Sequence, residues 1–271
     1  MSGVGTDPAF RPDLYTETAS WYDEFRVPYP AALLDDLRVR AQVTPTSTVL
    51  DLGCGTGQVG FGLHAAVCSV LAVDQEAEFV AYAKEKAERL RVRNITWTTG
   101  RAEDVSIDGE FDLVTIGNAF HRLPRQVIAE RATAWLRPGG CLALLWSNAP
   151  WDGELLWQQA LGKTLLEWRE RSDAVDRVPG DWQRAMATLP NTQVLQRAGF
   201  SVVGSFEFPT AHEWTAESLI GFVYSTSLLS KPVLGAQAEA FEVDVRARLQ
   251  RCDPGGVFRE EVGFRYDLAR R

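Results

Sequence analysis

The stretch V-L-D-L-G-C-G-T-G-Q-V-G, from Val49 to Gly60, places a glycine-rich turn directly after a short apolar run. Read from Gly55, it contains G-x-G-x-x-G, the pyrophosphate-binding pattern of dinucleotide-dependent dehydrogenases. Asp74 then lies 19 residues beyond Gly55, about where such enzymes hold a ribose with an acid. Read from Asp51, the same residues are D-x-G-x-G-x-G. The two interpretations predict different cofactors and therefore different reactions.

The position of Asp51 favours the second interpretation. A pyrophosphate sits on a helix N-terminus, drawn by free N–H groups and the positive end of the helix dipole. A carboxylate directly before that loop has no role in binding an anion. S-adenosylmethionine has no phosphate and carries an ammonium and a sulfonium, so Asp51 would face positive charge. Gly53, Gly55 and Gly57 would let the backbone approach the two halves of that cofactor.

The composition narrows the class of protein. At 271 residues with 45% hydrophobic content, the chain is long enough for one α/β domain with additions. It has no apolar run of membrane-spanning length, and its N-terminus lacks the pattern of a secretory signal, so we expect a cytoplasmic protein. A net charge of −8 argues against nucleic-acid binding, which leaves a small molecule as the expected partner. The spacing of the cysteines predicts no metal site.

The first half of the chain alternates short apolar runs with helical stretches. The apolar runs are Thr48–Leu52, Ser69–Asp74, Ile95–Thr99, Phe111–Ile116 and Cys141–Trp146. Residues 76–91 are rich in helix formers and predict a crossover helix between the second and third runs. This alternation predicts an α/β fold whose mostly parallel sheet is covered by helices on both faces.

The second half of the chain has a different pattern. No strand-like run occurs from Ser147 to Pro190, and the spacing of the apolar residues there predicts an amphipathic helix. Residues 191–198 predict a helix, 201–208 a strand, and 262–268 a half-buried strand with period-two alternation. We therefore divide the chain into an N-terminal helical cap (1–45), a cofactor-binding core (46–147), a helical, Trp-rich insertion over the acceptor site (148–190) and the C-terminal half of the sheet (191–271).

Five motifs in order resemble those of the class I S-adenosylmethionine-dependent methyltransferases. They are V-L-D-L-G-C-G-T-G, L-A-V-D-Q, G-R-A-E-D-V, F-D-L-V-T-I-G-N-A-F-H and L-R-P-G-G, and they cover about residues 49–146. The resemblance implies a Rossmann-like, seven-stranded sheet whose last strand is antiparallel. It also implies that S-adenosylmethionine is the cofactor.

The same resemblance assigns the cofactor-binding residues. Asp74 takes both ribose hydroxyls, Ala102 supplies backbone to the adenine, and Glu103 is the partner of its exocyclic amine. The full predicted set is Asp51, Gly53, Gly55, Gly57, Gln58, Asp74, Gln75, Ala102, Glu103, Asn118 and Ala119. An alternative role for Asp51 is to bond the amides of the loop, and Gln58 and Gln75 would then only flank the nucleoside.

Upstream, A-S-W-Y-D-E-F-R-V-P-Y-P resembles the Y-D-x-x-R-P-x-Y-P entry segment of small-molecule methyltransferases related to the ubiquinone-biosynthesis type. There an N-terminal helix folds over the cofactor. The resemblance implies that Tyr22, Arg26 and Tyr29 line the mouth of the site as a lid, with Arg26 a candidate to bind a carboxylate. Val27 departs from the pattern, which often has proline at that position. The alternative is a surface helix with ordinary packing aromatics.

His121 is the candidate general base. Methyl transfer is an in-line displacement, so the main tasks of the protein are alignment and the exclusion of water. His121 follows the fourth predicted strand at its carboxyl end, where ligands bind in open α/β sheets, and neutral imidazole can accept a proton from a hydroxyl. This favours O-methylation and leaves nitrogen and carbon acceptors open. The alternative is that His121 caps the next helix or bonds a lid residue.

The tryptophans of the predicted insertion bear on the acceptor. Trp151, Trp157, Trp168 and Trp182 favour a partly apolar acceptor, because aromatic walls suit such ligands. Their alternative role is to pack the insertion onto the sheet. Two other functions fit the glycine loop: a nicotinamide-dependent oxidoreductase, and a non-catalytic module that binds a nucleoside.

Overall fold

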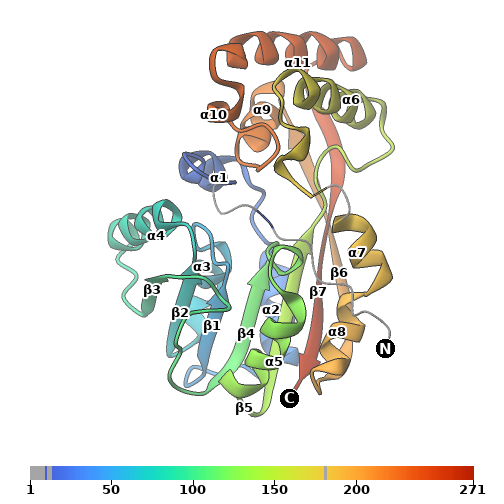
Figure 1. Ribbon diagram of the computed structural model, residues 1–271. Coiled ribbons are helices and arrows are strands. Elements are labelled where there is room, and N and C mark those ends of the chain that lie inside the picture. The colour runs from blue at the N-terminus through green and yellow to red at the C-terminus, as the bar shows by residue number, and fades with distance from the viewer. Residues whose placement is uncertain (1–9, 11–13, 180–181) are drawn as a thin grey trace.

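The computed structural model describes residue 10 and residues 14–179 and 182–271, and a single mixed sheet organises it (Figure 1). Its strands are β1 (Thr48–Leu52), β2 (Ser69–Asp74), β3 (Ile95–Thr99), β4 (Phe111–Gly117), β5 (Leu136–Ser147), β6 (Ser201–Trp214) and β7 (Phe258–Arg270). The sheet has seven strands in the order β3-β2-β1-β4-β5-β7-β6. Strand β7 pairs antiparallel with both of its neighbours. The predicted fold class is therefore confirmed.

The centre of the sheet is buried on both faces. Val49, Leu50 and Leu52 of β1 are fully buried, as expected for a central parallel strand. On one face the sheet packs against α2 (Ala31–Arg40) and α3 (Gln58–Leu63). On the other it packs against α5 (Arg125–Trp135) and α8 (Asn191–Arg197). Helix α4 (Ala77–Leu90) follows β2 and lies beside β2 and β3. In open α/β sheets of this kind, ligands bind at the loops that follow the carboxyl ends of the parallel strands.

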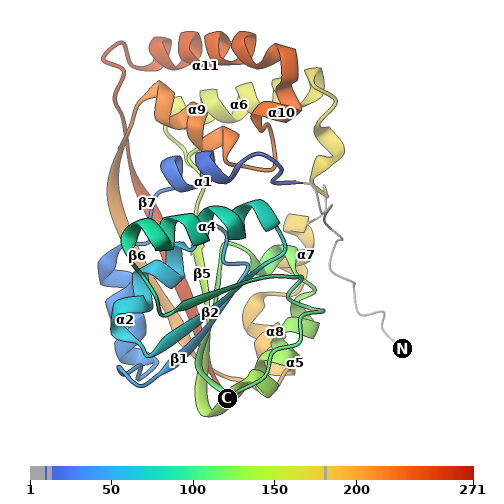
Figure 2. The same ribbon diagram turned by 90° about the vertical axis from the view of Figure 1, so that its left-hand side faces the viewer.

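A group of helices stands beyond one end of the sheet (Figure 2). We call it the helical cap, or the cap, and it is distinct from the N-terminal helical cap expected for residues 1–45. It consists of α6 (Leu156–Arg171), α9 (Ala216–Tyr224), α10 (Lys231–Leu234) and α11 (Ala238–Cys252). Trp168 of α6 donates a hydrogen bond from Nε1 to Asp244 of α11 at 2.9 Å. Only α6 comes from the predicted insertion, because α9 to α11 connect β6 to β7. The cap is thus assembled from two separate segments of the chain.

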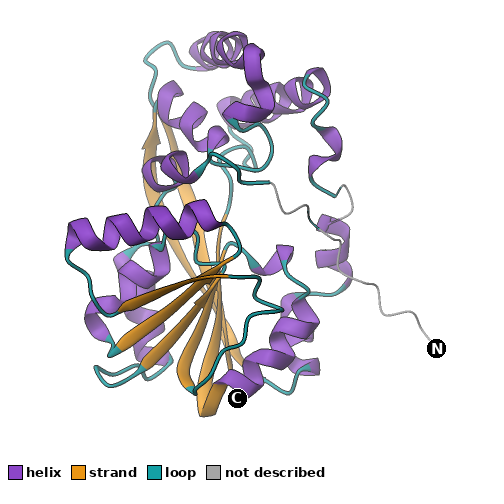
Figure 3. Cartoon of the chain, turned by 60° about the vertical axis from the view of Figure 1, so that its left-hand side comes forward, coloured by secondary structure: helices purple, strands orange, loops and turns teal. Residues whose placement is uncertain are grey.

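Strands β6 and β7 are longer than the sequence pattern predicted, and they carry the cap. Their pairing runs from Ser201 opposite Arg270 to Trp214 opposite Phe258, with one register shift between Val202 and Gly204. Trp214 and Phe258 at the far end are buried in the core of the cap. The two-stranded ribbon therefore joins the cap firmly to the sheet (Figure 3).

Helix α1 (Ala19–Phe25) bridges the cap and the sheet domain. The Trp21 ring contacts Tyr224 of α9 edge to face at 5.1 Å. On the other side, Asp23 forms a 2.5 Å ion pair with Lys86 of α4. These contacts fix α1 above the carboxyl ends of the parallel strands.

The remaining elements are short. They are η1 (His64–Ala66), η2 (Phe120–Arg122), η3 (Val175–Arg177), α7 (Trp182–Thr188) and η4 (Gly235–Gln237). Within the described residues, no helix is long and apolar enough to cross a membrane.

Candidate active site

The turn after β1 has a backbone that only glycine adopts easily. Gly53, Gly55 and Gly57 have φ values of 62°, 56° and 89°, all in the left-handed region. A Cβ on Gly53 would lie 2.7 Å from the Cβ of Ala119, so a side chain there would close the approach between two loops. At Gly57 a Cβ would lie 2.5 Å from the Trp97 ring, so this glycine serves packing at the start of α3.

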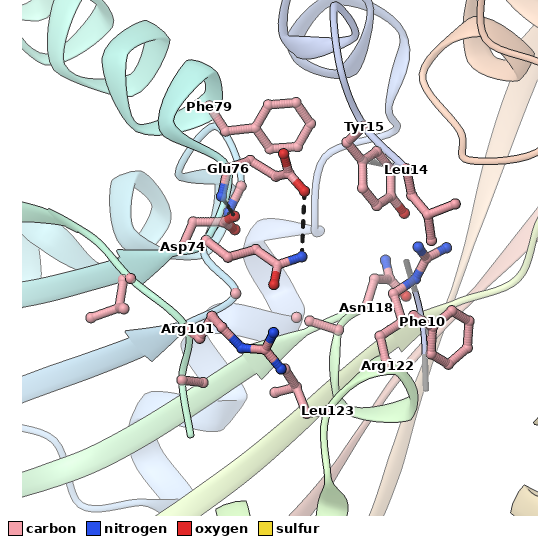
Figure 4. A pocket seen from close by; sticks show the side chains of 18 of the residues that line it. Phe10, Leu14, Tyr15, Asp74, Glu76, Phe79, Arg101, Asn118, Arg122 and Leu123 are labelled. Carbon is pink, nitrogen blue, oxygen red and sulfur yellow. Dashed lines mark hydrogen bonds between the residues drawn. The ribbon is translucent and has the colours of Figure 1, made fainter. Parts of the chain in front are cut away.

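A cavity of about 260 Å³ opens next to this turn (Figure 4). Its lining contains nine of the residues predicted from the sequence: Tyr22, Gly53, Gly55, Asp74, Gln75, Ala102, Glu103, Asn118 and Ala119. They come from α1 and from the carboxyl ends of β1, β2, β3 and β4. The structure therefore brings residues from four separate motifs to one cavity, which we call the main cavity.

Asp74, at the end of β2, is the best-oriented carboxylate of the main cavity. Its Oδ2 accepts a hydrogen bond from the Gly55 amide at 2.7 Å, and Oδ1 accepts one from the Glu76 amide at 2.9 Å. Burial raises the pKa of Asp74, and the backbone hydrogen bonds oppose that shift. The two amides fix the plane of the carboxylate while its remaining lone pairs can accept ribose hydroxyls. The site therefore fits a nucleoside.

The loop after β3 forms a second side of the main cavity. Arg101 Nε donates to Glu103 Oε1 at 2.9 Å, so the carboxylate predicted to bind the adenine amine is also half of an exposed ion pair. Across the cavity, the Tyr15 and Phe79 rings lie 5.6 Å apart, centroid to centroid. Figure 4 shows these rings and Arg101 directed toward the cavity from different segments.

Asn118 fixes the loop after β4. Its Nδ2 donates to Ser147 Oγ at 3.0 Å, and its Oδ1 accepts from the Ser147 amide at 3.0 Å. Its φ of 50° lies in the left-handed region, which asparagine tolerates better than most residues. Because the side-chain amide is engaged with β5, the backbone of Asn118 and Ala119 is what this loop offers to a ligand.

Asp51, Gln58 and Tyr29 do not line the main cavity. They surround a space of about 10 Å³ beside it, shared with Tyr22. Asp51 Oδ1 accepts from Thr115 Oγ1 at 2.8 Å, whereas Asp51 Oδ2 and the Tyr29 hydroxyl have no hydrogen-bond partner among the described residues. Burial raises the pKa of Asp51 to about 7. These buried acceptors fit an ammonium group better than an anion.

Arg26 lies at the junction of α1, α9 and the sheet, outside the main cavity. Its Nε donates to Ser225 Oγ at 2.8 Å and its Nη2 to the Ser225 carbonyl at 3.2 Å. The guanidinium carbon lies 4.8 Å from the centroid of the Tyr22 ring and 4.5 Å from that of Phe222. Of the three predicted lid residues, Tyr22 therefore lines the main cavity, and Arg26 and Tyr29 line small spaces next to it.

His121 lies away from the predicted cofactor residues. Its ring lines a separate cavity of about 230 Å³ and contacts Trp146 edge to face at 5.1 Å. Its Nε2 accepts a hydrogen bond from Arg122 Nε at 3.2 Å. Burial, followed by the charge of Arg122, lowers the pKa of His121 well below its ordinary value. The imidazole is thus neutral and bonded to a residue that does line the main cavity.

Sequence reasoning missed several lining residues, among them Phe10, Leu14, Tyr15, Phe79, Arg101 and Arg122. Arg122 had a signal, since it follows His121 in the loop after β4. Phe10 and Leu14 had none. Conversely, Trp157 and Trp168 are buried in the cap and Trp151 packs against it, and none of the three lines the main cavity. The side chain of Trp182 lies outside the described residues.

Comparisons with known proteins agree with this geometry. The methyltransferase-domain family matches residues 49–140. An uncharacterized methyltransferase of Mycobacterium bovis is 30% identical over 208 residues, covering 76% of this chain and 73% of that protein. One from Schizosaccharomyces pombe is 29% identical over 136 residues, covering 48% of this chain and only 52% of that protein.

Solved structures show the same fold. A candidate type II methyltransferase of Anaeromyxobacter dehalogenans has a TM-score of 0.62 at 20% identity, covering 91% of this chain and 97% of that one. A coclaurine N-methyltransferase, solved with N-methylheliamine and S-adenosylhomocysteine, has a TM-score of 0.51 at 16% identity. It covers 89% of this chain and 72% of that one.

The glycine turn, the acid at the end of β2 and the similarity to known methyltransferases agree. The chain belongs to the class I S-adenosylmethionine-dependent methyltransferases. It is an enzyme, and its cofactor is S-adenosylmethionine. The D-x-G-x-G-x-G interpretation of the glycine loop is therefore confirmed over the dehydrogenase pattern. Within the described residues, no cluster of histidine, cysteine or acidic side chains could hold a metal ion.

Proposed function

We propose that this chain methylates a small, partly apolar acceptor. The observation that carries the proposal is the main cavity, which joins nucleoside-binding groups to an aromatic wall. That wall comes from Phe10, Tyr15, Tyr22 and Phe79 and not from the tryptophans of the insertion. A cavity of this size, bordered by Tyr22 of α1, has room for a compact ligand.

The residues divide the work of holding the cofactor. Asp74 accepts from the ribose, Ala102 and Glu103 face the adenine, and Gly53 and Gly55 leave room for the amino-acid half. When bound, S-adenosylmethionine supplies a methyl group that its sulfonium has already activated. The task left to the protein is to align the acceptor with that methyl group and keep water out.

Oxygen is the acceptor atom that Arg122 favours. An ionised oxygen that lies against the Arg122 guanidinium would be stabilised by its charge, whereas the acids Asp74, Glu76 and Glu103 border other parts of the same cavity. An acceptor that arrives ionised, or that ionises in this field, needs no strong protein base.

Nitrogen is the second candidate. The (S)-coclaurine N-methyltransferase of Papaver somniferum is 25% identical over 216 residues, covering 79% of this chain and 54% of that protein. Glu76, an acid that lines the main cavity, is the group that could attract an amine here.

Calorimetry and turnover test the proposal. We expect S-adenosylhomocysteine to bind and, at 100 times its Kd, to raise the free energy of unfolding by about 2.7 kcal/mol. NADH should do neither. A screen with radiolabelled methyl donor should then label small phenols, acids or alcohols. Tight NADH binding, or labelling confined to protein or nucleic acid, would contradict the proposal.

His121 provides a separate test of the acid–base chemistry. If it is a base, His121→Ala should lower kcat by about 10²–10⁴-fold. We expect instead a raised KM for the acceptor with kcat changed less than about tenfold, because His121 positions Arg122. Since the pKa of His121 is lowered, no acid limb from it should appear between pH 6 and 7. A kcat loss in the full range, together with loss of an acid limb, would make His121 the base.

A further inference from the structure

The guanidinium of Arg122, a half-buried residue, has no carboxylate partner among the described residues. Its Nη2 donates to Ser227 Oγ at 3.0 Å and its Nε to His121, both neutral groups. Its Nη1 is buried and has no hydrogen-bond partner in the described part of the chain. Arg101, the other arginine of the main cavity, is instead paired with Glu103 and with Asp104 at 3.4 Å.

The surroundings of Arg122 do not replace a counterion. Its guanidinium carbon lies 4.8 Å from the Tyr15 ring centroid and 5.4 Å from that of Phe10. Cation–π contacts of this kind stabilise a guanidinium less than a carboxylate partner does, and a charge that is partly removed from water is costly without such a partner. Arg122 lines the main cavity, so an anionic ligand bound there is placed to supply the missing counterion.

On this basis we infer that the acceptor carries a carboxylate that binds Arg122. The inference rests on the proposed small-molecule methylation and adds the chemical class of the acceptor. Phe10 and Tyr15 would cover its apolar body while Arg122 holds its charged end. His121 and Ser227, through their hydrogen bonds to the guanidinium, act as positioning residues.

The cofactor also contains a carboxylate, and the positions of the two arginines separate these sources. Arg26 shares its small space with Gln58, beside the buried acceptors Asp51 and Tyr29 that fit the cofactor's ammonium. Arg122 lies in the loop after β4 and lines the main cavity together with Leu123 and Pro124. The amino-acid half of the cofactor therefore has Arg26 within its own region, and Arg122 is left for the acceptor.

The test uses the full chain and carboxylic acids paired with their primary amides: benzoate, phenylacetate and cinnamate, each in the presence of S-adenosylhomocysteine. We expect at least one acid to bind the wild type at least about tenfold more tightly than its amide, the scale of one charge-assisted contact. Arg122→Gln should remove that preference and leave the affinity for S-adenosylhomocysteine within about threefold. Arg122→Lys should keep part of the preference, because it retains the charge without the planar fork.

Two control variants separate binding from structure. Arg177→Gln removes a guanidinium that donates to the Ser227 carbonyl at 3.4 Å but does not line the main cavity, so the acid preference should persist. Ser227→Ala removes the hydroxyl that Arg122 contacts. Because Ser227 positions the guanidinium, this variant should lose part of the acid preference. If Arg122→Gln instead weakens the binding of each acid and its amide equally, the arginine acts only as an anchor for that segment and the proposal is wrong.

The cofactor arm compares S-adenosylhomocysteine with methylthioadenosine, which lacks the amino-acid carboxylate. If Arg122→Gln lowers the affinity for S-adenosylhomocysteine about tenfold and leaves the affinity for methylthioadenosine unchanged, Arg122 binds the cofactor and the inference is overturned. It is overturned equally if no acid of the panel binds better than its amide. A wild type that fails to bind S-adenosylhomocysteine would instead contradict the proposed function itself.

Discussion

Two buried aspartates serve the site in different ways. Asp74 is held by two backbone amides and has lone pairs directed to the main cavity. Asp51 is fully buried, bonded to Thr115 by one oxygen and without a partner among the described residues at the other. Sequence spacing predicts both near the cofactor, but only the structure shows that the first is held by two amides and the second is partly compensated.

Replacement of Asp74 tests the ribose contact. Asp74→Ala should weaken the binding of S-adenosylhomocysteine by about 1.5–3 kcal/mol, because charge-assisted hydrogen bonds are lost. Asp74→Asn keeps one oxygen acceptor and should lose less. Isothermal calorimetry measures the affinities, and thermal unfolding shows that both variants are folded. Unchanged affinity in a folded Asp74→Ala protein would place the ribose elsewhere.

The raised pKa of Asp51 predicts how stability depends on pH. The carboxyl is protonated in the folded chain up to about pH 7, whereas in the unfolded chain it ionises near its ordinary value of 3.8. Its contribution to stability is therefore complete below pH 3.8 and is lost as the pH rises toward 7. From pH 5 to pH 8, the free energy of unfolding of the wild type should fall by about 2–3 kcal/mol relative to that of Asp51→Asn. The asparagine stays neutral and can still accept a hydrogen bond from Thr115.

Urea unfolding of both proteins without cofactor, at the two pH values, measures this difference. Because other titrating groups are common to the two chains, they cancel in the comparison. A difference that stays constant with pH would show that Asp51 is already ionised at pH 5 in the folded protein.

At the scale of elements, the sequence predicts the parallel half of the sheet well. The ranges expected for β1, β2 and β3 are those observed, because continuous apolar runs between turns have no competing pattern. Helix α11 was not expected, and β6 and β7 extend beyond their apolar cores. Their extra length depends on pairing with each other and on packing against the cap, which are contacts between distant residues that local periodicity does not contain.

The packing of α1 on α9 depends on one glycine. A Cβ on Gly221 would overlap the Phe25 ring, so Gly221→Ala should force Phe25 to move and cost about 1–3 kcal/mol of stability. The matched control is Gly162→Ala in α6, where the nearest atom to a Cβ is the Trp151 carbonyl oxygen at 3.5 Å. That change should be neutral or stabilise by up to about 1 kcal/mol through helix propensity.

Thermal unfolding and the affinity for S-adenosylhomocysteine measure the consequence. Since Tyr22 and Arg26 lie on or next to α1, Gly221→Ala should also lower the affinity for S-adenosylhomocysteine, whereas the control should not. Equal behaviour of the two variants would show that α1 packs loosely against α9.

At the scale of the whole molecule, the N-terminal segment borders the main cavity and the cap does not. Leu14, Tyr15 and Tyr22 line the main cavity, and no residue of α6 or α11 does. The cap is fixed to the sheet through the β6–β7 ribbon. We therefore expect cofactor binding to order the segment around α1 more than the cap.

Hydrogen exchange tests this division. S-adenosylhomocysteine should slow amide exchange in residues 14–25 by about tenfold or more, with little change in α6 and α11, because a ligand protects the elements that it holds closed. Adenosine, which lacks the amino-acid half, should protect less. Equal protection of the cap and the N-terminal segment would mean that they close together as one body.

The position of β7 between β5 and β6 has a consequence for biosynthesis. Strand β6 leaves the ribosome before β7, yet in the described part of the chain its ladder partner is β7 alone. Until β7 is made, the outer edge of β5 and both edges of β6 expose unpaired N–H and C=O groups, which attract other chains. A nascent chain that stalls before residue 258 already contains every motif predicted to bind the cofactor but cannot complete its sheet. Protection of the growing polypeptide by chaperones should therefore matter most during synthesis of the segment between β6 and β7.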